Sequence, residues 1–534
     1  MDKIKSLGVM LDCSRDAVYS VETLKTYFDL LAKMGYDSVQ LYTEDTYEAE
    51  GEPYFGYLRG RYSKAELKEI DAAAKERGLE LIPCIQTLAH LGGLTRWREY
   101  WASCTDTGDI LLAGEERTYR LIEHMFQTCA ECFSSRRINI GMDEAHMVGL
   151  GKYLDMHGYR NRFEILSEHL RRVGEIADKY GFKPMMWSDM FFRLANKGEY
   201  YCAGGNIPQE AIDLVPENME LIYWDYYSQD KSHYDGMIKA HKQFRNRIVF
   251  AGGAHSWEGF APFNRYSIEA TRAAMRSCAE NGVDDVFFTC WKDDGAECSL
   301  FASLPTLFCA AEFARGNYDD EKIAAKFRKL TGLDMDAFFA LEKINLCESA
   351  GEIKNPCKYM LYNDMFLGIY DRTAIGHSGQ EFAEARRYLE RGTQSRRFGY
   401  IFKTLASLCD VLEIKFTLGL RTREAYRPGD KQKLLGLAPE YAELERRVQK
   451  FYKQFRAQWD RECKPNGFEK HDIRLGGLKA RIGHCREMLE EYCAGKRADI
   501  SPLNEDLLPA EEEKDGCSVL TNSWLHTATI KPLM

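Results

Sequence analysis

Short apolar runs alternate with amphipathic helical patterns through the first 315 residues, and this alternation constrains the fold more than any other feature of the chain. A short apolar run has the length of a buried strand, and strands that alternate with helices are typical of a parallel sheet. The eight expected strands are Leu7–Leu11, Ser38–Tyr42, Leu79–Ile85, Ile138–Gly141, Pro184–Trp187, Leu221–Trp224, Ile248–Ala251 and Val286–Cys290. The expected helices between them include Val21–Met34, Lys64–Arg77, Arg117–Cys132, Phe163–Tyr180, Tyr234–Arg245 and Ile268–Asn281.

Eight strands separated by helices predict an α/β fold of the (β/α)8, or TIM-barrel, type. A doubly wound open sheet is the alternative, but that fold normally carries a glycine-rich phosphate-binding turn after its first strand. The first expected strand leads instead into Leu11-Asp-Cys-Ser-Arg15. The barrel is therefore favoured over the open sheet.

The chain after residue 317 shows helical periodicity without strand alternation, which predicts a separate α-helical domain. We therefore expect a catalytic barrel over 1–317 and a mostly helical domain over 318–534, with an extended tail after about residue 500. Glu511–Asp515 is expected as an acidic loop, and Ser518–Met534 as an extended segment able to dock back. The helices expected in this domain are Lys322–Leu330, Gln380–Arg391, Phe398–Leu420, Ala438–Gln458 and Leu475–Tyr492.

Composition argues against several classes of partner. The 534 residues carry a formal net charge of −10, which gives no reason to expect a nucleic acid or an anionic membrane surface. No run reaches the roughly 20 apolar residues of a membrane span, and the first residues lack the apolar core of a signal peptide. Seventeen cysteines are scattered through the expected strands and helices. Together these features predict a cytoplasmic protein with reduced thiols, in which Cys129 and Cys132 pack in a helix rather than bind metal.

Acidic and aromatic residues recur where the expected strands end. In a barrel of this type, catalytic side chains gather at the carboxyl ends of the strands. Indole rings stack on the C–H faces of sugars, and carboxylates accept hydrogen bonds from sugar hydroxyls, so this composition predicts a carbohydrate site. In chain order the strand ends carry Asp12 and Arg15, Glu44 and Asp45, His90, Asp143 with Glu144 and His146, Trp187 and Asp189, Trp224 with Asp225 and Tyr227, His255 and Trp257, and Trp291 with Asp293 and Asp294.

The adjacent acids Asp143 and Glu144 follow the apolar run Ile138-Asn-Ile-Gly-Met142. Burial and a neighbouring like charge raise a carboxyl pKa, so such a pair can keep one acid protonated while the other is ionised. A strand end followed by a helix N-cap is the alternative for the pair alone. A metal site that adds His90 and His146 is disfavoured, because consecutive strand residues start on opposite faces and no HxH or HExxH spacing is present. We expect no metal and no cofactor.

Four segments resemble, in order, the motifs of glycoside hydrolase family 20, the β-N-acetylhexosaminidases. The resemblance covers the expected barrel. An α/β domain commonly precedes the barrel in this family, and because the first expected strand starts at Leu7 we expect a short form without that domain. The segments are Gly8-Val-Met-Leu-Asp-Cys-Ser-Arg15, Gln40-Leu-Tyr-Thr-Glu-Asp45, Ile138-Asn-Ile-Gly-Met-Asp-Glu-Ala-His146 and Thr289-Cys-Trp-Lys-Asp-Asp-Gly295.

This resemblance implies an exo-acting enzyme that removes terminal β-linked N-acetylglucosamine, or N-acetylgalactosamine, by a substrate-assisted retaining mechanism. Glu144 would be the general acid and then the base, and the substrate's 2-acetamido oxygen would be the nucleophile. Asp143 would hold the acetamido N–H. A retaining glycosidase with a carboxylate nucleophile and a non-catalytic carbohydrate-binding barrel remain the alternatives.

The resemblance also implies roles for the surrounding residues. Arg15 would bind the hydroxyls of the terminal sugar, and Tyr227, beyond Asp225, would donate to the acetamido oxygen. Tyr223 is the alternative donor, although it is expected deeper in its strand. Asp293, or its neighbour Asp294, would bind the outer hydroxyls. His90 would hydrogen-bond Glu144 with Glu44 behind it, His146 would support the acid pair, and the pocket walls would be Trp187, Trp257 and Trp291. The helical domain is expected either to cover the barrel or to form a homodimer interface.

Overall fold

The computed structural model describes residues 4–510 and 522–531. Contacts divide the chain into two compact units. The barrel unit consists of Met1–Ala254, Ser267–Trp291 and Thr306–Asp319, and the helical unit consists of His255–Tyr266, Lys292–Pro305 and Asp320–Met534. Two segments that follow strands thus group with the later helices, and the predicted domain boundary at residue 317 stays a prediction.

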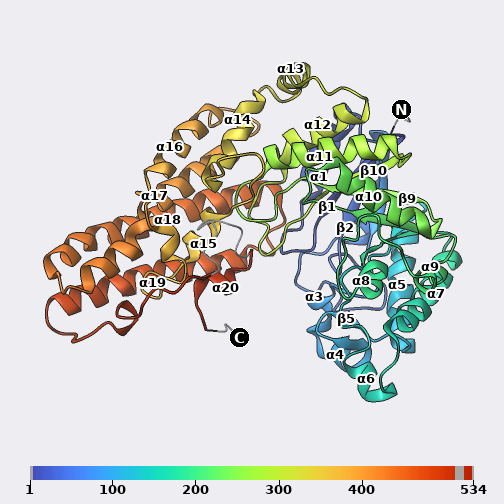
Figure 1. Ribbon diagram of the computed structural model, residues 1–534, viewed down its shortest axis with the longest axis horizontal. Coiled ribbons are helices and arrows are strands. Elements are labelled where there is room, and N and C mark those ends of the chain that lie inside the picture. Colours follow the sequence, from blue (N-terminus) through green and yellow to red (C-terminus); the bar gives the residue numbers. More distant parts are fainter. Residues whose placement is uncertain (1–3, 511–521, 532–534) are drawn as a thin grey trace. The chain divides into compact units, whose positions relative to one another are not determined.

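Eight parallel strands close into a barrel in the order β1-β10-β9-β8-β7-β6-β3-β2. Strands β1, β2, β9 and β10 are labelled in Figure 1. All eight predicted strands, and the barrel itself, are confirmed. The strands are β1 (Ser6–Asp12), β2 (Ser38–Tyr42), β3 (Glu80–Cys84), β6 (Arg137–Asn139), β7 (Lys183–Trp187), β8 (Glu220–Trp224), β9 (Ile248–Gly253) and β10 (Asp285–Cys290).

Amphipathic helices follow the strands and bury one apolar face each. In the first of them, α1 (Val21–Met34), the Ser20 side chain caps the start and Gly35, at φ 86°, ends the helix. The predicted helix that begins at Tyr234 is α10 followed by a short 3-10 turn. The other long helices of this unit are α2 (Lys64–Glu76), α5 (Glu116–Cys132), α7 (Arg162–Lys179), α10 (Lys231–His241), α11 (Asn264–Glu280) and α12 (Leu304–Ala314). Helix α11 belongs to the unit from Ser267 onward, and helix α12 from Thr306 onward.

The loops between strands and helices contain short elements that the sequence patterns did not predict. Their few residues cannot establish a helical or strand period. The antiparallel pair β4 (Thr105–Thr107) and β5 (Ile110–Leu111) lies in the long connection after β3. The short helices are α3 (Gly92–Thr95), α4 (Arg98–Cys104), α6 (Lys152–His157), α8 (Asp189–Ala195) and α9 (Gln209–Asp213).

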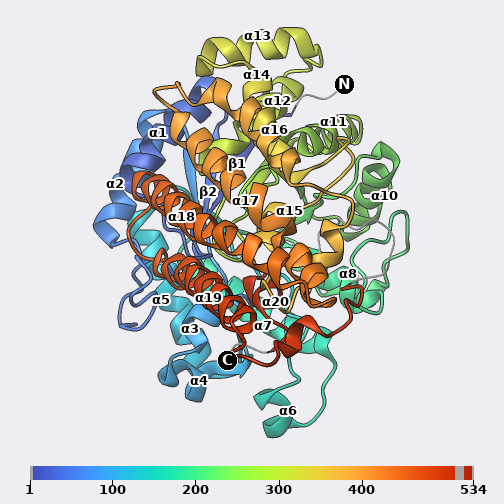
Figure 2. The same ribbon diagram turned by 90° about the vertical axis from the view of Figure 1, so that its left-hand side faces the viewer.

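The helical unit confirms the predicted mostly helical character of the later chain. Its three longest helices, α17 (Gly399–Tyr426), α18 (Lys431–Glu462) and α19 (Glu469–Cys493), pack in sequence beside one another (Figure 2). Leu412, Leu444 and Phe451 are fully buried in this packing. The unit also contains α13 (Asp320–Thr331), α14 (Met335–Phe339), α15 (Pro356–Tyr362) and α16 (Gln380–Leu389).

The last part of the chain differs from the expected extended tail. Trp524–Ala528 form the short helix α20, whose first N–H donates to the Asp294 carboxylate. The expected acidic loop over 511–515 lies outside the described residues. Within the described part of the chain, no helix combines the length and the apolar character needed to cross a membrane. Cys129 and Cys132 are buried free thiols of α5, as expected for core packing.

Candidate active site

The acid pair lies on a tight turn immediately after β6. Gly141, Met142 and Glu144 all have left-handed φ values, of 74°, 68° and 53°. Such values are strained for residues with side chains and concentrate at functional sites. A Cβ on Gly141 would lie 2.0 Å from the Gln86 side-chain oxygen, so the turn needs glycine there. The turn leaves the Asp143 side chain 11% exposed and the Glu144 side chain 43% exposed.

His90 and Gln86 both contact Asp143. Gln86 Nε2 donates to Asp143 Oδ1 at 2.7 Å, and His90 Nε2 lies 3.2 Å from Asp143 Oδ2. The separation of His90 Nε2 from Glu144 Oε2 is 3.6 Å. The resemblance implied that His90 serves Glu144, but its shorter contact is with Asp143. Gln86 was not predicted, because nothing in the sequence marks a glutamine after β3 as facing the next strand end.

The contact between His90 and Asp143 favours the charged form of both side chains. Burial lowers the pKa of His90, but the charge of Asp143 and its hydrogen bond, together with the charge of Glu44, outweigh burial and raise that pKa to about 9. Burial raises the pKa of the Asp143 carboxyl, but the charge of His90 and the hydrogen bond from Gln86 bring that pKa below its usual range. At neutral pH the pair is therefore an imidazolium and a carboxylate.

Two residues of α8 hold Glu144 from the other side. The Glu144 N–H donates to Asp189 Oδ2 at 3.1 Å, and Arg193 Nε donates to the same oxygen at 3.2 Å. Arg193 Nη2 lies 3.8 Å from Glu144 Oε1. Burial, followed by the charge of Asp143, raises the pKa of the Asp189 carboxyl to about 7. Arg193 was not predicted, although its i,i+4 spacing from Asp189 was a signal that could have found it.

A hydrogen-bonded network extends from Gln86 to the end of β1. Gln86 donates to the Tyr42 hydroxyl at 3.1 Å, and that hydroxyl donates to Glu44 Oε1 at 3.1 Å. Arg15 Nε lies 3.2 Å from the same Glu44 oxygen, and Arg15 Nη1 donates to Asp12 at 3.0 Å. Burial raises the pKa of Glu44, opposed by the charge of Arg15. Arg15 and Glu44 are thus brought to the acid pair as expected, but Glu44 reaches it through Tyr42 and Gln86.

Two of the three predicted tryptophans line this part of the barrel. The Trp187 and Trp291 rings lie 6.0 Å apart, and Tyr42 meets Trp291 edge-on at 4.8 Å. The Arg15 guanidinium lies 4.9 Å from the Trp291 ring centroid. Trp291 Nε1 donates to the Tyr226 hydroxyl at 3.1 Å. These aromatic residues form a wall on the same side of the network as Arg15.

The segment after β8 carries two adjacent tyrosines, Tyr226 and Tyr227, that have different surroundings. The Tyr226 hydroxyl contacts Trp291, whereas the predicted donor Tyr227 is 50% exposed. Asp225 is buried and its Oδ2 lies 2.7 Å from both the Tyr223 hydroxyl and His233 Nε2. The sequence could not distinguish the neighbouring tyrosines, because the turn after the strand decides which ring faces inward.

The remaining predicted binding residues belong to the helical unit. Trp257 is buried and stacks on His255 at 4.1 Å between ring centroids. Asp294 accepts hydrogen bonds from Arg474 at 2.6 Å and from the Trp524 N–H at 2.5 Å. Asp294 is therefore engaged within the helical unit. Its neighbour Asp293 contributes, after burial, to raising the pKa of Glu258 to about 7.

His146 is exposed beside the acid pair, and its N–H donates to the Glu144 carbonyl at 2.7 Å. Burial and the charge of Arg193 lower the pKa of His146. Across residues 4–510 and 522–531, no three His, Cys, Asp or Glu side chains are placed to hold a metal ion.

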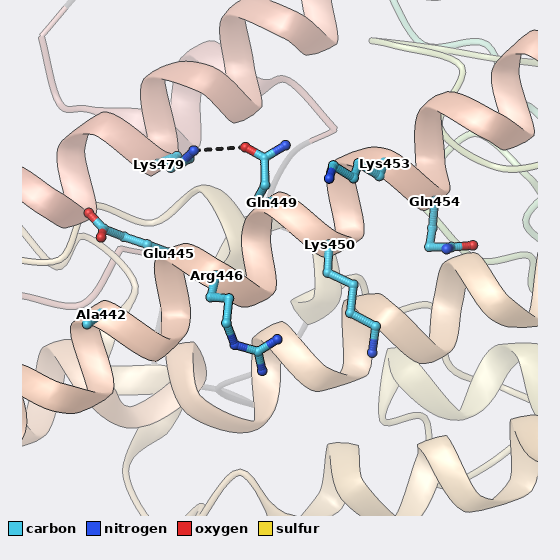
Figure 3. Close-up of a pocket in the computed structure, with 8 residues that line it drawn as sticks. All are labelled: Ala442, Glu445, Arg446, Gln449, Lys450, Lys453, Gln454 and Lys479. Carbon is cyan, nitrogen blue, oxygen red and sulfur yellow. Dashed lines mark hydrogen bonds between the residues drawn. The ribbon is translucent and has the colours of Figure 1, made fainter.

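A groove of about 530 Å³ in the helical unit has a different chemical character (Figure 3). Its lining comes mainly from α18, and the Lys479 side chain of α19 donates to Gln449 at 2.8 Å. The lining contains one acid, Glu445, and four cations, namely Arg446, Lys450, Lys453 and Lys479. A site with a single acid among cations lacks the acid pair that glycoside cleavage requires.

Two family models match the chain. The model of the glycosyl hydrolase family 20 catalytic domain matches residues 7–244, and that of the glycoside hydrolase 20C C-terminal domain matches residues 336–521. Hexosaminidase D of Homo sapiens is 24% identical over 339 residues, covering 59% of this chain and 66% of the relative. Hexosaminidase D of Bos taurus is 24% identical over 215 residues, covering 38% of this chain and 58% of the relative. The chain thus spans less than two thirds of either relative.

Solved structures with some similarity include two enzymes of bacteria. A GH20 exo β-N-acetylglucosaminidase from Vibrio harveyi is 16% identical, with a TM-score of 0.47, covering 62% of this chain and 59% of that chain. A β-N-acetylhexosaminidase from Bacteroides fragilis NCTC 9343 is 17% identical, with a TM-score of 0.48, covering 62% of this chain and 70% of that chain.

Proposed function

Because the chain belongs to glycoside hydrolase family 20 and is therefore a glycoside hydrolase, we propose that it removes terminal β-linked N-acetylglucosamine from glycans as an exo-acting β-N-acetylhexosaminidase. N-acetylgalactosamine is the second candidate sugar. One observation carries this proposal: a buried Asp143, paired with protonated His90, lies directly beside the partly exposed Glu144. One acid is thus kept ionised next to another that is open to the substrate.

The proposed mechanism divides the chemistry between these two acids. Glu144 gives its proton to the leaving glycosidic oxygen as the bond from that oxygen to the anomeric carbon breaks. The substrate's acetamido oxygen attacks the anomeric carbon and closes an oxazolinium ring. Asp143 accepts a hydrogen bond from the acetamido N–H and offsets the positive charge of the ring. Glu144 then takes a proton from water, which attacks the anomeric carbon and opens the ring with net retention.

The surrounding network supports this assignment. Arg15 is held by Asp12 and Glu44 beside the Trp291 ring, where it would bind the hydroxyls of the terminal sugar. Trp187 and Trp291 would enclose the acetamido group, with a tyrosine hydroxyl donating to its oxygen. Tyr226 is a candidate for that donor beside Tyr227, because its hydroxyl already reaches Trp291. Asp225 completes the proposed binding set of the barrel unit.

We extend the proposal to the molecule's organisation. Residues 1–317 would form the catalytic domain and residues 318–534 the helical domain, which would mediate a homodimer. A cytoplasmic location would suit the chain, since every cysteine in the described ranges is free.

The experiment that tests the function compares two aryl substrates that differ only in the 2-substituent. Aryl β-N-acetylglucosaminide should turn over and aryl β-glucoside should not, because the glucoside carries no internal nucleophile. Equal activity on the two would contradict substrate assistance and favour a carboxylate nucleophile. Binding of the sugar without turnover would favour a non-catalytic barrel.

A further inference from the structure

Three aromatic residues from two loops of the barrel unit form a partly exposed cluster, called here the aromatic platform: Tyr54, Tyr57 and the half-buried Trp97. The Tyr54 and Trp97 rings stack with centroids 5.3 Å apart. Tyr57 meets Trp97 at 5.5 Å and Tyr54 at 6.0 Å, both edge-on. Tyr54 is 40% and Tyr57 43% exposed. Grouped aromatic rings left in water mark binding surfaces more often than scattered ones do.

Both loops that carry the platform start at residues of the candidate active site. Tyr54 and Tyr57 belong to the connection between β2 and α2, whose first residues include Glu44 and Asp45. Trp97 precedes α4 and follows His90 by seven residues. The carboxyl ends of β2 and β3 are neighbours in the barrel, so the platform belongs to the same edge as the acid pair.

One arginine fixes these loops to that edge. The Arg59 guanidinium donates to the Asp45 carboxylate and to the Ser14 carbonyl, the residue before Arg15. Gly93, in α3, packs on this junction, because a Cβ there would lie 2.2 Å from Arg59 Nη1 and 2.9 Å from Asp45 Oδ2. The platform is therefore built on a rigid base adjoining the residues that would hold the terminal sugar.

From this position we infer that the aromatic platform, with its two exposed tyrosines and half-buried Trp97, binds the sugar rings on the leaving-group side of the scissile bond. This inference rests on the proposed function and adds the class of substrate, a glycan of several sugars. Aromatic rings offer flat apolar faces to the C–H faces of sugars. Arg96 lies 5.5 Å from the Trp97 ring and is exposed, which places hydrogen-bond donors for sugar hydroxyls beside the stack.

The leaving-group side is favoured over the terminal sugar itself for a steric reason. Trp187, Trp291 and Arg15 already form the wall assigned to the terminal residue. An exo-acting pocket holds a single sugar, so the rest of the glycan must pass over the rim of the barrel. The exposed tyrosines of the platform lie on the loop that leaves this rim after β2, and they contact Trp97 on the loop that leaves it after β3.

The test compares kcat/KM for a β-1,4-linked N-acetylglucosamine tetrasaccharide with kcat/KM for methyl β-N-acetylglucosaminide. The methyl group is too small to reach the platform, so the ratio of the two constants isolates the contribution of the later sugars. We expect this ratio to fall about two- to tenfold in Trp97→Ala and in Tyr57→Ala, the range that one aromatic contact accounts for. Trp97→Phe, which keeps a ring, should recover part of the ratio.

Tyr388→Ala on α16 is the matched control, because Tyr388 is 45% exposed, close to the value for Tyr57, and belongs to the helical unit. Its ratio should equal that of the wild type. An unchanged ratio in the Trp97 and Tyr57 variants, or the same fall in Tyr388→Ala, would overturn the inference and leave the platform as a loop contact or a protein-binding surface. A wild-type enzyme that hydrolyses neither substrate would contradict the proposed function instead.

Discussion

The charges of His90 and Asp143 depend on each other, and this dependence sets a pH window for stability. The pKa of His90 is raised from 6.5 to about 9, so protonated His90 stabilises the folded state. This contribution is complete below pH 6.5 and is lost as the pH rises through about 9. Its size is on the order of 3 kcal/mol, since one pKa unit corresponds to about 1.4 kcal/mol.

We therefore expect His90→Gln, which keeps a neutral donor, to lower the free energy of unfolding most at pH 6 and least above pH 9. Denaturant unfolding of both proteins at a series of pH values measures the difference. A difference that stays constant from pH 6 to 10 would show that His90 is not charged in the folded protein.

The two acids should respond differently to neutral replacement. Glu144→Gln removes the mobile proton and Asp143→Asn removes the fixed charge, and each should lower kcat/KM by about 10²–10⁴-fold on aryl β-N-acetylglucosaminide. Because proton donation matters most for poor leaving groups, the loss in Glu144→Gln should shrink with a strongly acidic phenol as leaving group, whereas the loss in Asp143→Asn should not. Equal dependence on the leaving group in both variants would show that the roles are not divided in this way.

At the scale of secondary structure, we expect Asp189 of helix α8 to lower the stability of the fold while it holds Glu144 in position. The pKa of Asp189 is raised from 3.8 to about 7, so ionisation of this buried acid destabilises the fold. That cost begins above pH 3.8 and is complete above pH 7. Asp189→Asn, which imitates the protonated acid, should therefore gain stability relative to the wild type as the pH rises through this window.

The same substitution should lower kcat more than it raises KM. Asp189 acts through the Glu144 N–H and through Arg193, which reaches Glu144 Oε1, rather than by touching the substrate. Thermal unfolding and steady-state kinetics on one preparation measure both effects. A variant that is more stable at pH 7.5 and fully active would show that this contact does not position Glu144.

The strands could be predicted because each is a short, mostly apolar segment that is buried in the barrel. Such a segment can be recognised from its own residues, without knowing which strands lie beside it. The order of motifs along the strands likewise indicated Asp143, Glu144 and Arg15. The contacts of the site could not be predicted, because they depend on backbone turns. Met142 and Glu144 have left-handed φ values, and the turn that they form sets the position of Asp143 beside His90. No periodicity in the sequence encodes such φ values.

Short elements and long-range contacts account for the other features of the site that the sequence did not predict. Helix α8 has seven residues, too few to show a period, yet it brings Arg193 to Glu144. Sugar binding by Asp294 stays a prediction from its motif, and the sequence did not indicate that Arg474, 180 positions later, engages its carboxylate. Contacts of this separation follow from tertiary packing rather than from local sequence.

At the scale of the whole molecule, the proposed chemistry needs only protein acids and the substrate's own acetamido group. The full-length enzyme should therefore keep its kcat and KM after exhaustive treatment with a chelator, and added Zn²⁺ or Mg²⁺ should not raise them. Activity that falls with chelation and returns with one metal would contradict the account of catalysis by Asp143 and Glu144 alone.

The central claim is that the nucleophile belongs to the substrate, and a series of fluorinated acetamides tests it most directly. Each fluorine on the acetyl methyl withdraws electrons from the amide oxygen without altering the leaving group. Aryl β-glucosaminides carrying acetyl, fluoroacetyl, difluoroacetyl and trifluoroacetyl groups should show a steep, progressive fall in kcat with the wild-type enzyme, because attack by the acetamido oxygen becomes harder at every step. A kcat that is independent of fluorination would contradict the account and assign the attack to a carboxylate of the protein.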